Sequence, residues 1–197
     1  MQDSSRINLS SARFLIVDDN DKSLKILCDL VRSFGAGSVT AASSAFEAQE
    51  LMSRQRFDLL ITDAVMPDYD GYALVRWLRA RPEDEERIIP ALIVSAHTRE
   101  EEIAMGRDCG AHFMIAKPIS PTVLLERIFW IATHQRNFLV CETYAGPDRR
   151  WKNRAPPSEF GAGRRRSDLS IEIGAATDAN LSGDAIDALL KPQKVRS

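Results

Sequence analysis

Four short apolar runs, each closed by polar residues, constrain the fold of this chain more than any other feature. They cover residues 14–17, 59–62, 91–94 and 113–116. A continuous apolar run of this length is typical of a strand that is buried on both faces, as in a parallel sheet. Helix-like segments separate and follow the runs, at about 22–34, 44–55, 71–80, 99–108 and 120–135. Alternating strands and helices predict an α/β fold with a doubly wound parallel sheet.

Polar side chains follow each predicted strand. Asp18 and Asp19 follow the first, Asp63 the second, Ser95 the third and Lys117 the fourth. Ligands of such sheets bind outside the carboxyl ends of the strands, so we expect these side chains to converge. Neighbouring carboxylates repel unless a cation joins them, and oxygen ligands of this kind suit Mg²⁺. With a lysine to neutralise phosphate, the predicted site performs phosphoryl transfer to a carboxylate.

Each of these residues has a simpler interpretation when it is taken singly. An acid after a strand commonly forms a turn or caps the next helix, and Asp18, Asp19 and Asn20 are suited to that role. Phosphatases resembling haloacid dehalogenases also use an aspartyl nucleophile, but they need a second acid two residues later, where this chain has Val65. The ordered set of polar strand ends favours the phosphoryl-transfer site over both alternatives.

The chain resembles the receiver domain of two-component response regulators, the CheY-like family, over roughly residues 12–135. The resemblance rests on Val17-Asp18-Asp19-Asn20, on the stretch from Asp63 through Met66-Pro67 to Asp70-Gly71, on Ser95-Ala96 and on Lys117-Pro118. It implies a flavodoxin-like, five-stranded parallel sheet with the strand order 2-1-3-4-5.

The resemblance also implies a role for each site residue. Asp63 is expected to accept a phosphoryl group from a phosphohistidine of a histidine kinase or phosphotransfer protein. Asp19, Asp63 and the backbone carbonyl of Val65 are expected to bind Mg²⁺, and Asp18 to hold a metal-bound water. Ser95 and Lys117 would contact the phosphoryl group, and Lys117-Pro118 would be a cis peptide.

Two features depart from the pattern of the family or modify it. Receivers usually carry an aromatic residue three positions before the lysine, and here that residue is Met114, beside Phe113 on the opposite face of the strand. Met114 and Ser95 are therefore the candidate switch residues. Val65 and His97 lie two residues beyond Asp63 and Ser95, where receivers tune hydrolysis of the phosphoryl group. An apolar Val65 cannot orient a water, which predicts a long-lived phosphoryl group.

Composition and cysteine spacing limit the remaining possibilities. Hydrophobic residues make up 44% of the 197 residues, which is normal for a globular protein. No apolar run approaches the length of a membrane span, and the first residues lack a signal-peptide pattern, so we expect a cytoplasmic protein without membrane contact. Cys28, Cys109 and Cys141 fit no metal spacing, and the first two are expected to be packing residues.

We divide the chain into an N-terminal lead (1–11), a receiver domain (12–136) and a largely irregular C-terminal extension (137–197). We expect residues 137–141 to form one further strand, which either extends the sheet or pairs with a partner. Residues 184–191 read as a short amphipathic helix. An aromatic residue followed by paired arginines occurs twice in the extension, which makes these residues candidates for partner binding: Tyr144, Arg149, Arg150, Phe160, Arg165 and Arg166.

The predicted function is that of a response regulator that signals through protein contacts with an unidentified downstream protein. We expect no enzymatic activity beyond phosphorylation and dephosphorylation of the receiver itself. Residues 136–197 hold 11 basic and 8 acidic side chains, so a nucleic-acid-associated regulator that acts through the basic tail is one alternative. A phosphate sink or relay intermediate is another, and a homodimer stays open as the assembly state.

Overall fold

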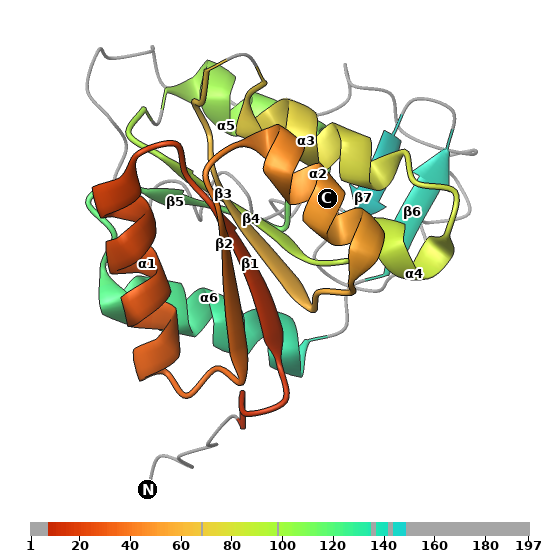
Figure 1. Cartoon of the computed structure of the whole chain (residues 1–197). Helices are drawn as coiled ribbons and strands as arrows, with labels where there is room; N and C mark the ends of the chain where they lie inside the picture. The colour runs from red at the N-terminus through yellow and green to blue at the C-terminus, as the bar shows by residue number, and fades with distance from the viewer. Residues whose placement is uncertain (1–7, 68, 98, 135–136, 142–143, 149–197) are drawn as a thin grey trace, which may run out of the picture.

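A five-stranded parallel sheet forms the centre of the molecule, with the strand order β2-β1-β3-β4-β5 (Figure 1). The computed structural model describes residues 8–67, 69–97, 99–134, 137–141 and 144–148. The predicted flavodoxin-like strand order is confirmed. The strands are β1 (Arg13–Val17), β2 (Ser38–Ala42), β3 (Leu59–Asp63), β4 (Ala91–Ser95) and β5 (Phe113–Ala116).

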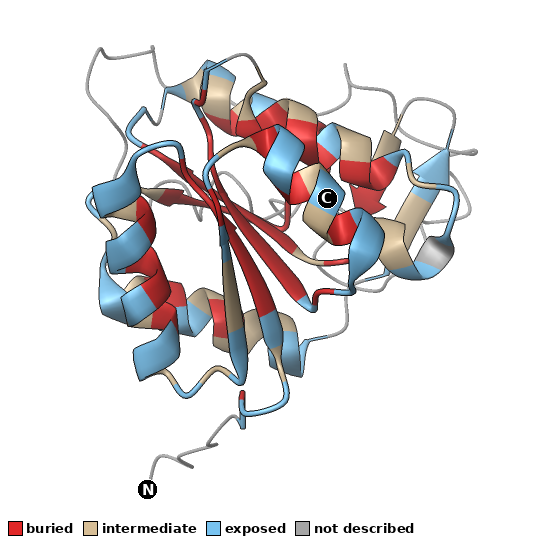
Figure 2. Ribbon diagram, viewed as in Figure 1, coloured by how far each residue is buried: buried red, intermediate tan, exposed pale blue. Residues whose placement is uncertain are grey.

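Helices cover both faces of the sheet (Figures 1 and 2). α1 (Asp21–Ser33) and α6 (Pro121–Thr133) pack on one face. α2 (Ala45–Arg54), α3 (Gly71–Arg79) and α5 (Glu100–Asp108) pack on the other, and the short α4 (Asp84–Arg87) leads into β4. Figure 2 shows that the inner stripe of each long helix is buried, as expected for amphipathic helices on a sheet.

The burial of the strands explains which of them the sequence reveals. Every residue of β3 and β4 is buried, and their apolar runs are continuous. β2 is an edge strand whose only buried residue is Ala42, so it lacks such a run. Cys28 and Cys109 are buried in the two layers between sheet and helices, which confirms that they are packing residues.

Polar caps start the helices immediately after the strands. The Asn20 side chain accepts hydrogen bonds from the backbone N–H groups of Lys22 and Ser23, each at 3.1 Å, so Asn20 is the N-cap of α1. Asp70 caps α3 in the same way and accepts from the N–H of Ala73 at 2.6 Å. These caps turn the chain within a few residues and keep the strand ends open.

A two-stranded antiparallel hairpin follows the receiver fold. β6 (Phe138–Cys141) is the strand predicted at 137–141, but it pairs with β7 (Tyr144–Pro147) and not with the central sheet. The strand β7 was not predicted. Tyr144-Ala-Gly-Pro carries no apolar strand pattern, which is why the sequence did not reveal the partner of β6. The helix predicted at 184–191 lies outside the described residues.

Arg79 at the end of α3 anchors this hairpin to the receiver. Its guanidinium lies over the Phe138 ring, 5.1 Å from the ring centre. Nε donates to the carbonyl of Gly110 at 3.0 Å, and Nη1 donates to the carbonyl of Ile89 at 2.8 Å. Gly110 has a φ of +91°, and a side chain there would clash with the Ala145 carbonyl. The absence of a side chain at Gly110 therefore lets the hairpin approach the domain closely here.

Among the described residues, no helix is long and apolar enough to cross a membrane.

Candidate functional site

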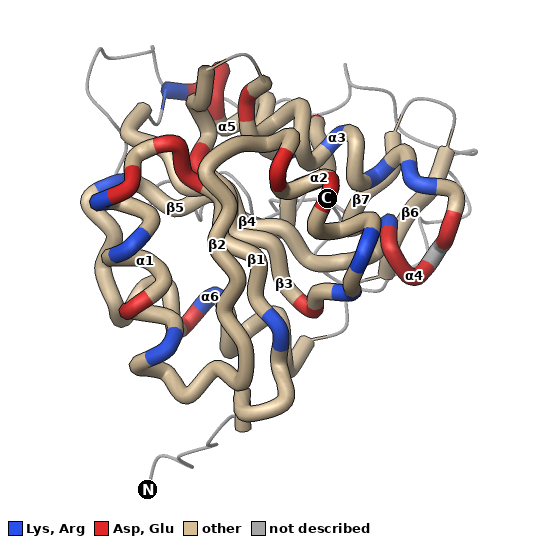
Figure 3. Tube along the Cα trace, in the orientation of Figure 1, with Lys and Arg blue, Asp and Glu red and all other residues tan. Residues whose placement is uncertain are grey.

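Three carboxylates meet at the carboxyl end of the sheet. Asp18 and Asp19 follow β1, and Asp63 ends β3, so the neighbouring strands bring them together. One carboxylate oxygen from each residue lies within 4.8 Å of the others. Asp18 and Asp63 are 2% and 9% exposed, whereas Asp19 is exposed. Figure 3 shows the acidic positions along the turn between β1 and α1.

Lys117 joins two of these carboxylates from the end of β5. Its Nζ lies 2.7 Å from an Asp63 oxygen and 3.0 Å from an Asp18 oxygen. Burial alone would lower the pKa of Lys117, but the hydrogen bonds with Asp63 and Asp18 outweigh burial and raise it. The lysine is therefore a fixed positive charge at neutral pH. The peptide bond between Lys117 and Pro118 is cis, as the resemblance implied.

The carboxyl group of Asp63 has a raised pKa. Burial is the largest cause, and the negative charges of Asp18 and Asp19 add to it. Lys117 opposes this shift through its hydrogen bond and its charge, but it does not cancel it. One lysine thus leaves the three-carboxylate cluster with an excess of negative charge, and a divalent cation would balance that excess.

The orientation of Asp18 is set by the first turn of α1. Its Oδ1 accepts from the backbone N–H of Asn20 at 2.9 Å, and its Oδ2 accepts from the Ser23 hydroxyl at 2.6 Å. Sequence reasoning missed Ser23, since a serine in a first helical turn carries no signal of a contact with the preceding strand end. Lys117 and Ser23 share the same Asp18 oxygen, which fixes the carboxylate at the edge of the site.

Gly71 brings the start of α3 close to Asp63. A side chain at this position would clash with the backbone carbonyl of Asp63. The Gly71 N–H donates to the carbonyl of Ala64 at 3.0 Å, which closes the loop after β3. The Asp70-Gly71 pair therefore combines a helix cap with the close approach that holds the loop against the end of β3.

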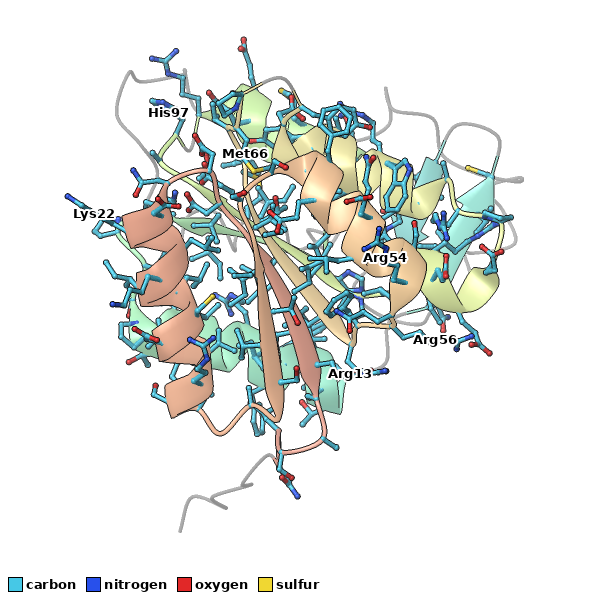
Figure 4. The ribbon with its side chains drawn as sticks, viewed as in Figure 1. Arg13, Lys22, Arg54, Arg56, Met66 and His97 are labelled. Carbon is cyan, nitrogen blue, oxygen red and sulfur yellow. The ribbon has the colours of Figure 1, made fainter. Side chains whose placement is uncertain are left out.

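Ser95 ends β4 and is 1% exposed. Its hydroxyl donates to the carbonyl of His97 at 2.6 Å and accepts from the N–H of His97 at 3.1 Å. Figure 4 places His97 and Met66 at one end of the molecule, and Arg13 and Arg56 at the opposite end. The His97 side chain is exposed at the end that carries the acids.

The remaining predicted residues fall into different environments. Val65 lies in the loop after β3 with a side chain that is 61% exposed. Met114 and Phe113 are both buried and belong to opposite layers of the core, which confirms their predicted alternation. Tyr144 lies in β7, where its hydroxyl donates to the carbonyl of Pro147 at 2.9 Å. The other partner-binding candidates lie outside the described residues: Arg149, Arg150, Phe160, Arg165 and Arg166.

The donor set fits Mg²⁺. Carboxylate oxygens are the hard ligands that this ion prefers, and a site with few protein ligands leaves room for waters and phosphate oxygens. The exposure of Asp19 leaves the cluster open on one side. Histidine and cysteine do not contribute to this cluster, which argues against a zinc-type site.

Comparison with known proteins identifies the family. The family model of the response regulator receiver domain matches residues 14–129. The chain belongs to the response regulator receiver family. All the site residues from Asp18 to Lys117 lie within the matched segment. The members of this family are the receiver domains of two-component signal transduction. A receiver domain implies a histidine kinase or a phosphotransfer protein as partner, and receivers usually bind Mg²⁺ at an acidic site.

The match covers nearly the whole of some similar proteins and about half of others. The chemotaxis protein CheY of Pseudomonas aeruginosa is 30% identical over 116 residues, which cover 59% of this chain and 92% of CheY. Response regulator MprA of Mycobacterium leprae is 35% identical over 59% of this chain, but the match covers only 49% of MprA. A putative response regulator of Chloroflexus aurantiacus, known from its crystal structure, has a TM-score of 0.58 and 31% identity, over 62% of this chain and 98% of that one.

Proposed function

We propose that this protein is a response regulator that accepts a phosphoryl group on Asp63 from a phosphohistidine. The observation that carries the proposal is the arrangement around Asp63, where Asp18 and Asp19 lie within 4.8 Å and the Lys117 ammonium lies 2.7 Å away. An acidic cluster with a single lysine suits an incoming phosphoryl group whose charge is shared between that lysine and a metal ion.

In the proposed reaction, a carboxylate oxygen of Asp63 attacks phosphorus, and the bond between phosphorus and the histidine nitrogen of the partner breaks. The imidazole keeps the electron pair of that bond. Lys117 balances charge on the phosphoryl oxygens, and the Ser95 hydroxyl turns to donate to one of them. Positioning and charge neutralisation supply most of the catalysis in such transfers.

Asp19, Asp63 and the backbone carbonyl of Val65 would hold Mg²⁺, and Asp18 would hold one of its waters. When bound, the ion would supply positive charge that offsets the negative charge of the carboxylates and of the phosphoryl oxygens. Asp18 is suited to an indirect role, because both of its oxygens already accept hydrogen bonds from protein groups. Asp19 is exposed and free to turn toward an ion.

Phosphotransfer from radiolabelled histidine kinases and phosphotransfer proteins tests this function. We expect rapid transfer from one of them to the wild type in the presence of Mg²⁺, and no transfer to Asp63→Asn. Asp58→Asn is the matched control, because Asp58 lies just before β3 at its opposite end, paired with Arg13. Equal labelling of Asp63→Asn and the wild type would contradict the proposal.

We propose further that output occurs through contacts with a downstream protein, with no catalytic output of its own. Phosphorylation shifts the population of receiver conformations, and a partner reads the altered surface. The basic tail and a purely phosphate-storing role are the alternatives. Deletion of residues 149–197, which leaves the hairpin that Arg79 contacts in place, distinguishes these alternatives. A phosphate sink keeps its activity without the tail, whereas a tail-driven regulator loses it.

A gel shift with DNA or RNA tests the nucleic-acid alternative. Binding through the tail would weaken steeply as salt rises, because each phosphate contact releases counterions. We expect no such salt-dependent binding by the full chain. Steep salt dependence that the truncated protein lacks would favour the nucleic-acid-associated regulator.

A further inference from the structure

Tyr72 is a buried residue beside Ser95 to which the proposed reaction gives no role. It lies in the first turn of α3, and its side chain is 3% exposed within the core layer of α2, α3 and α5. Its hydroxyl is buried and has no hydrogen-bond partner among the described residues. An unpaired buried donor is costly and is uncommon in folded proteins.

Glu102 and Ser95 both act on the Tyr72 hydroxyl. Burial is the main reason that the pKa of Tyr72 is raised, the Glu102 carboxylate raises it further, and the Ser95 hydroxyl lowers it. Ser95 lies two residues after Ile93 on β4 and therefore faces the same core layer as Tyr72. Glu102 and Ser95 are the polar side chains with the largest effect on the tyrosine hydroxyl. Glu102 Oε2 is itself buried and without a hydrogen-bond partner among the described residues.

Ser95 has the capacity to receive the tyrosine. A hydroxyl carries one hydrogen and two lone pairs. In this structure the hydrogen goes to the His97 carbonyl, and one lone pair accepts from the His97 N–H. A Ser95 hydroxyl that donates to a phosphoryl oxygen on Asp63 must give up the His97 carbonyl, because it has only one hydrogen. The second lone pair of the Ser95 oxygen accepts from no described group in this structure, so it can accept from a donor in the protein interior.

The position of Met114 strengthens the case for Tyr72. Met114 is 2% exposed, and a side chain on Gly106 of α5 would clash with its sulfur atom. The residue is therefore already packed inward against α5, and no larger ring has to enter from outside. Tyr72 belongs to the same core layer and carries the polar atom that Met114 lacks.

We propose that Tyr72 is a positioning residue for Ser95. Its hydroxyl donates to Ser95 Oγ when Ser95 donates to the phosphoryl group on Asp63. The resulting chain runs from Tyr72 through Ser95 to the phosphoryl oxygen, and each hydrogen bond polarises the next. This inference rests on the proposed function, since it needs a phosphoryl group on Asp63.

The pairing would connect the site to two helices. Tyr72 lies at the start of α3, and the His97 carbonyl released by Ser95 belongs to the loop that leads into α5. Phosphorylation would thus tighten the contact between β4 and α3, and it would loosen the loop before α5. The α3 and α5 helices cover the same face of the sheet (Figure 1).

A double-mutant cycle with Tyr72→Phe and Ser95→Ala tests the proposal. Beryllofluoride with Mg²⁺ serves as the probe, because it mimics a phosphoryl group on an aspartate. Calorimetry should give a dissociation constant for beryllofluoride that is roughly 3- to 10-fold larger in Tyr72→Phe than in the wild type. A difference of that size corresponds to the loss of one net hydrogen bond. In the Ser95→Ala background the same change should have no further effect.

A purely structural role of Tyr72 predicts something different. It would change the stability of the metal-free protein and weaken beryllofluoride binding equally in both backgrounds, which would overturn the proposal. Tyr69→Phe is the matched control, because the Tyr69 hydroxyl donates to the Ala73 carbonyl at 3.3 Å within the same helix region. We expect it to leave the dissociation constant of beryllofluoride unchanged.

Two further outcomes are decisive. Coupling of Tyr72 to Glu102 rather than Ser95, measured with Glu102→Gln in the same cycle, would overturn the proposal in favour of a tyrosine–glutamate pair. If the wild type does not bind beryllofluoride, or binds it as well as Asp63→Asn does, the proposed function and this inference are overturned together. Binding by the wild type with an unaffected Tyr72→Phe variant would overturn the inference alone.

Discussion

The ammonium nitrogen of Lys117 lies 2.7 Å from a carboxylate oxygen of Asp63, so the ends of β5 and β3 are joined by an ion pair. Asp18 shares the same lysine at 3.0 Å from the end of β1. One cation thus serves two carboxylates, and Asp19 adds a third negative charge nearby. This imbalance of charge underlies several measurable properties of the protein.

Asp63→Asn should stabilise the metal-free protein at neutral pH. The raised pKa of Asp63 means that its ionised form is less favourable in the folded than in the unfolded state. The folded state binds more protons between the unfolded and folded pKa values, so stability falls as pH rises through that window. Urea unfolding at pH 7 without divalent metal should give a gain on the order of 1 kcal/mol.

Below the ordinary pKa of aspartate the advantage of Asp63→Asn should disappear, because the wild-type side chain is then neutral in both states. Addition of Mg²⁺ at neutral pH should reverse the order, since the ion stabilises only the protein that binds it. A variant that is less stable than the wild type in metal-free buffer at pH 7 would contradict this description of the site.

Removal of the Lys117 charge should have the opposite effect. Lys117→Met leaves Asp18 and Asp63 without their shared cation, and the free energy of unfolding should fall by about 1–3 kcal/mol, less than for a fully buried pair because the lysine is partly exposed. Combining Lys117→Met with Asp63→Asn should recover part of the loss. Strict additivity of the two changes would argue against a direct interaction.

The apolar side chain of Val65 leads us to expect slow hydrolysis of the phosphoryl group on Asp63. Its side chain is 61% exposed, two residues after Asp63, and is unable to hydrogen-bond an attacking water. Val65→Asn introduces a polar group and should raise the dephosphorylation rate of the isolated protein several-fold. Val65→Leu is the control, with an unchanged rate. No acceleration in the asparagine variant would remove Val65 as a determinant of hydrolysis.

Arg79 should contribute strongly to stability. It is buried, and burial lowers its pKa to about 10, so it is charged at neutral pH without a carboxylate partner among the described residues. Arg79→Ala leaves the Gly110 and Ile89 carbonyls unpaired and removes the contact with Phe138. The free energy of unfolding should fall by about 3 kcal/mol.

Arg76→Ala is the matched control for Arg79, because Arg76 lies on the exposed side of the same helix. Its effect should stay within about 0.5 kcal/mol. Hydrogen exchange of the hairpin amides should rise in Arg79→Ala alone. Unchanged protection of the β6 amides in that variant would mean that the hairpin is held by other contacts.

The sequence predicted the parts of the fold that local patterns encode. Continuous apolar runs revealed β1, β3, β4 and β5, and the polar residues at their ends predicted the convergence of Asp18, Asp19, Asp63 and Lys117. β2 was not located, because a half-exposed edge strand lacks a continuous apolar run. The four-residue helix α4 is charged and too short to show a helical period.

Contacts that depend on tertiary packing were beyond the sequence. Ser23 reaches Asp18 across the first turn of α1, and Tyr72 approaches Ser95 from another helix. β6 pairs with the strand that directly follows it, β7, which lacks an apolar pattern, and the contact of Arg79 with Phe138 joins residues far apart in the chain. These contacts follow from how the layers pack, and no spacing of residues in the sequence predicts them.

Phosphorylation of Asp63 by a small-molecule phosphodonor tests the central claim most directly. The purified protein should gain the mass of one phosphoryl group when acetyl phosphate and Mg²⁺ are supplied together, and chelation of the metal should prevent the gain. Peptide mapping should locate the group on Asp63, and Asp63→Asn should remain unmodified. Equal modification of Asp63→Asn, or phosphorylation at another residue of the wild type, would contradict the assignment of Asp63 as the phosphoacceptor.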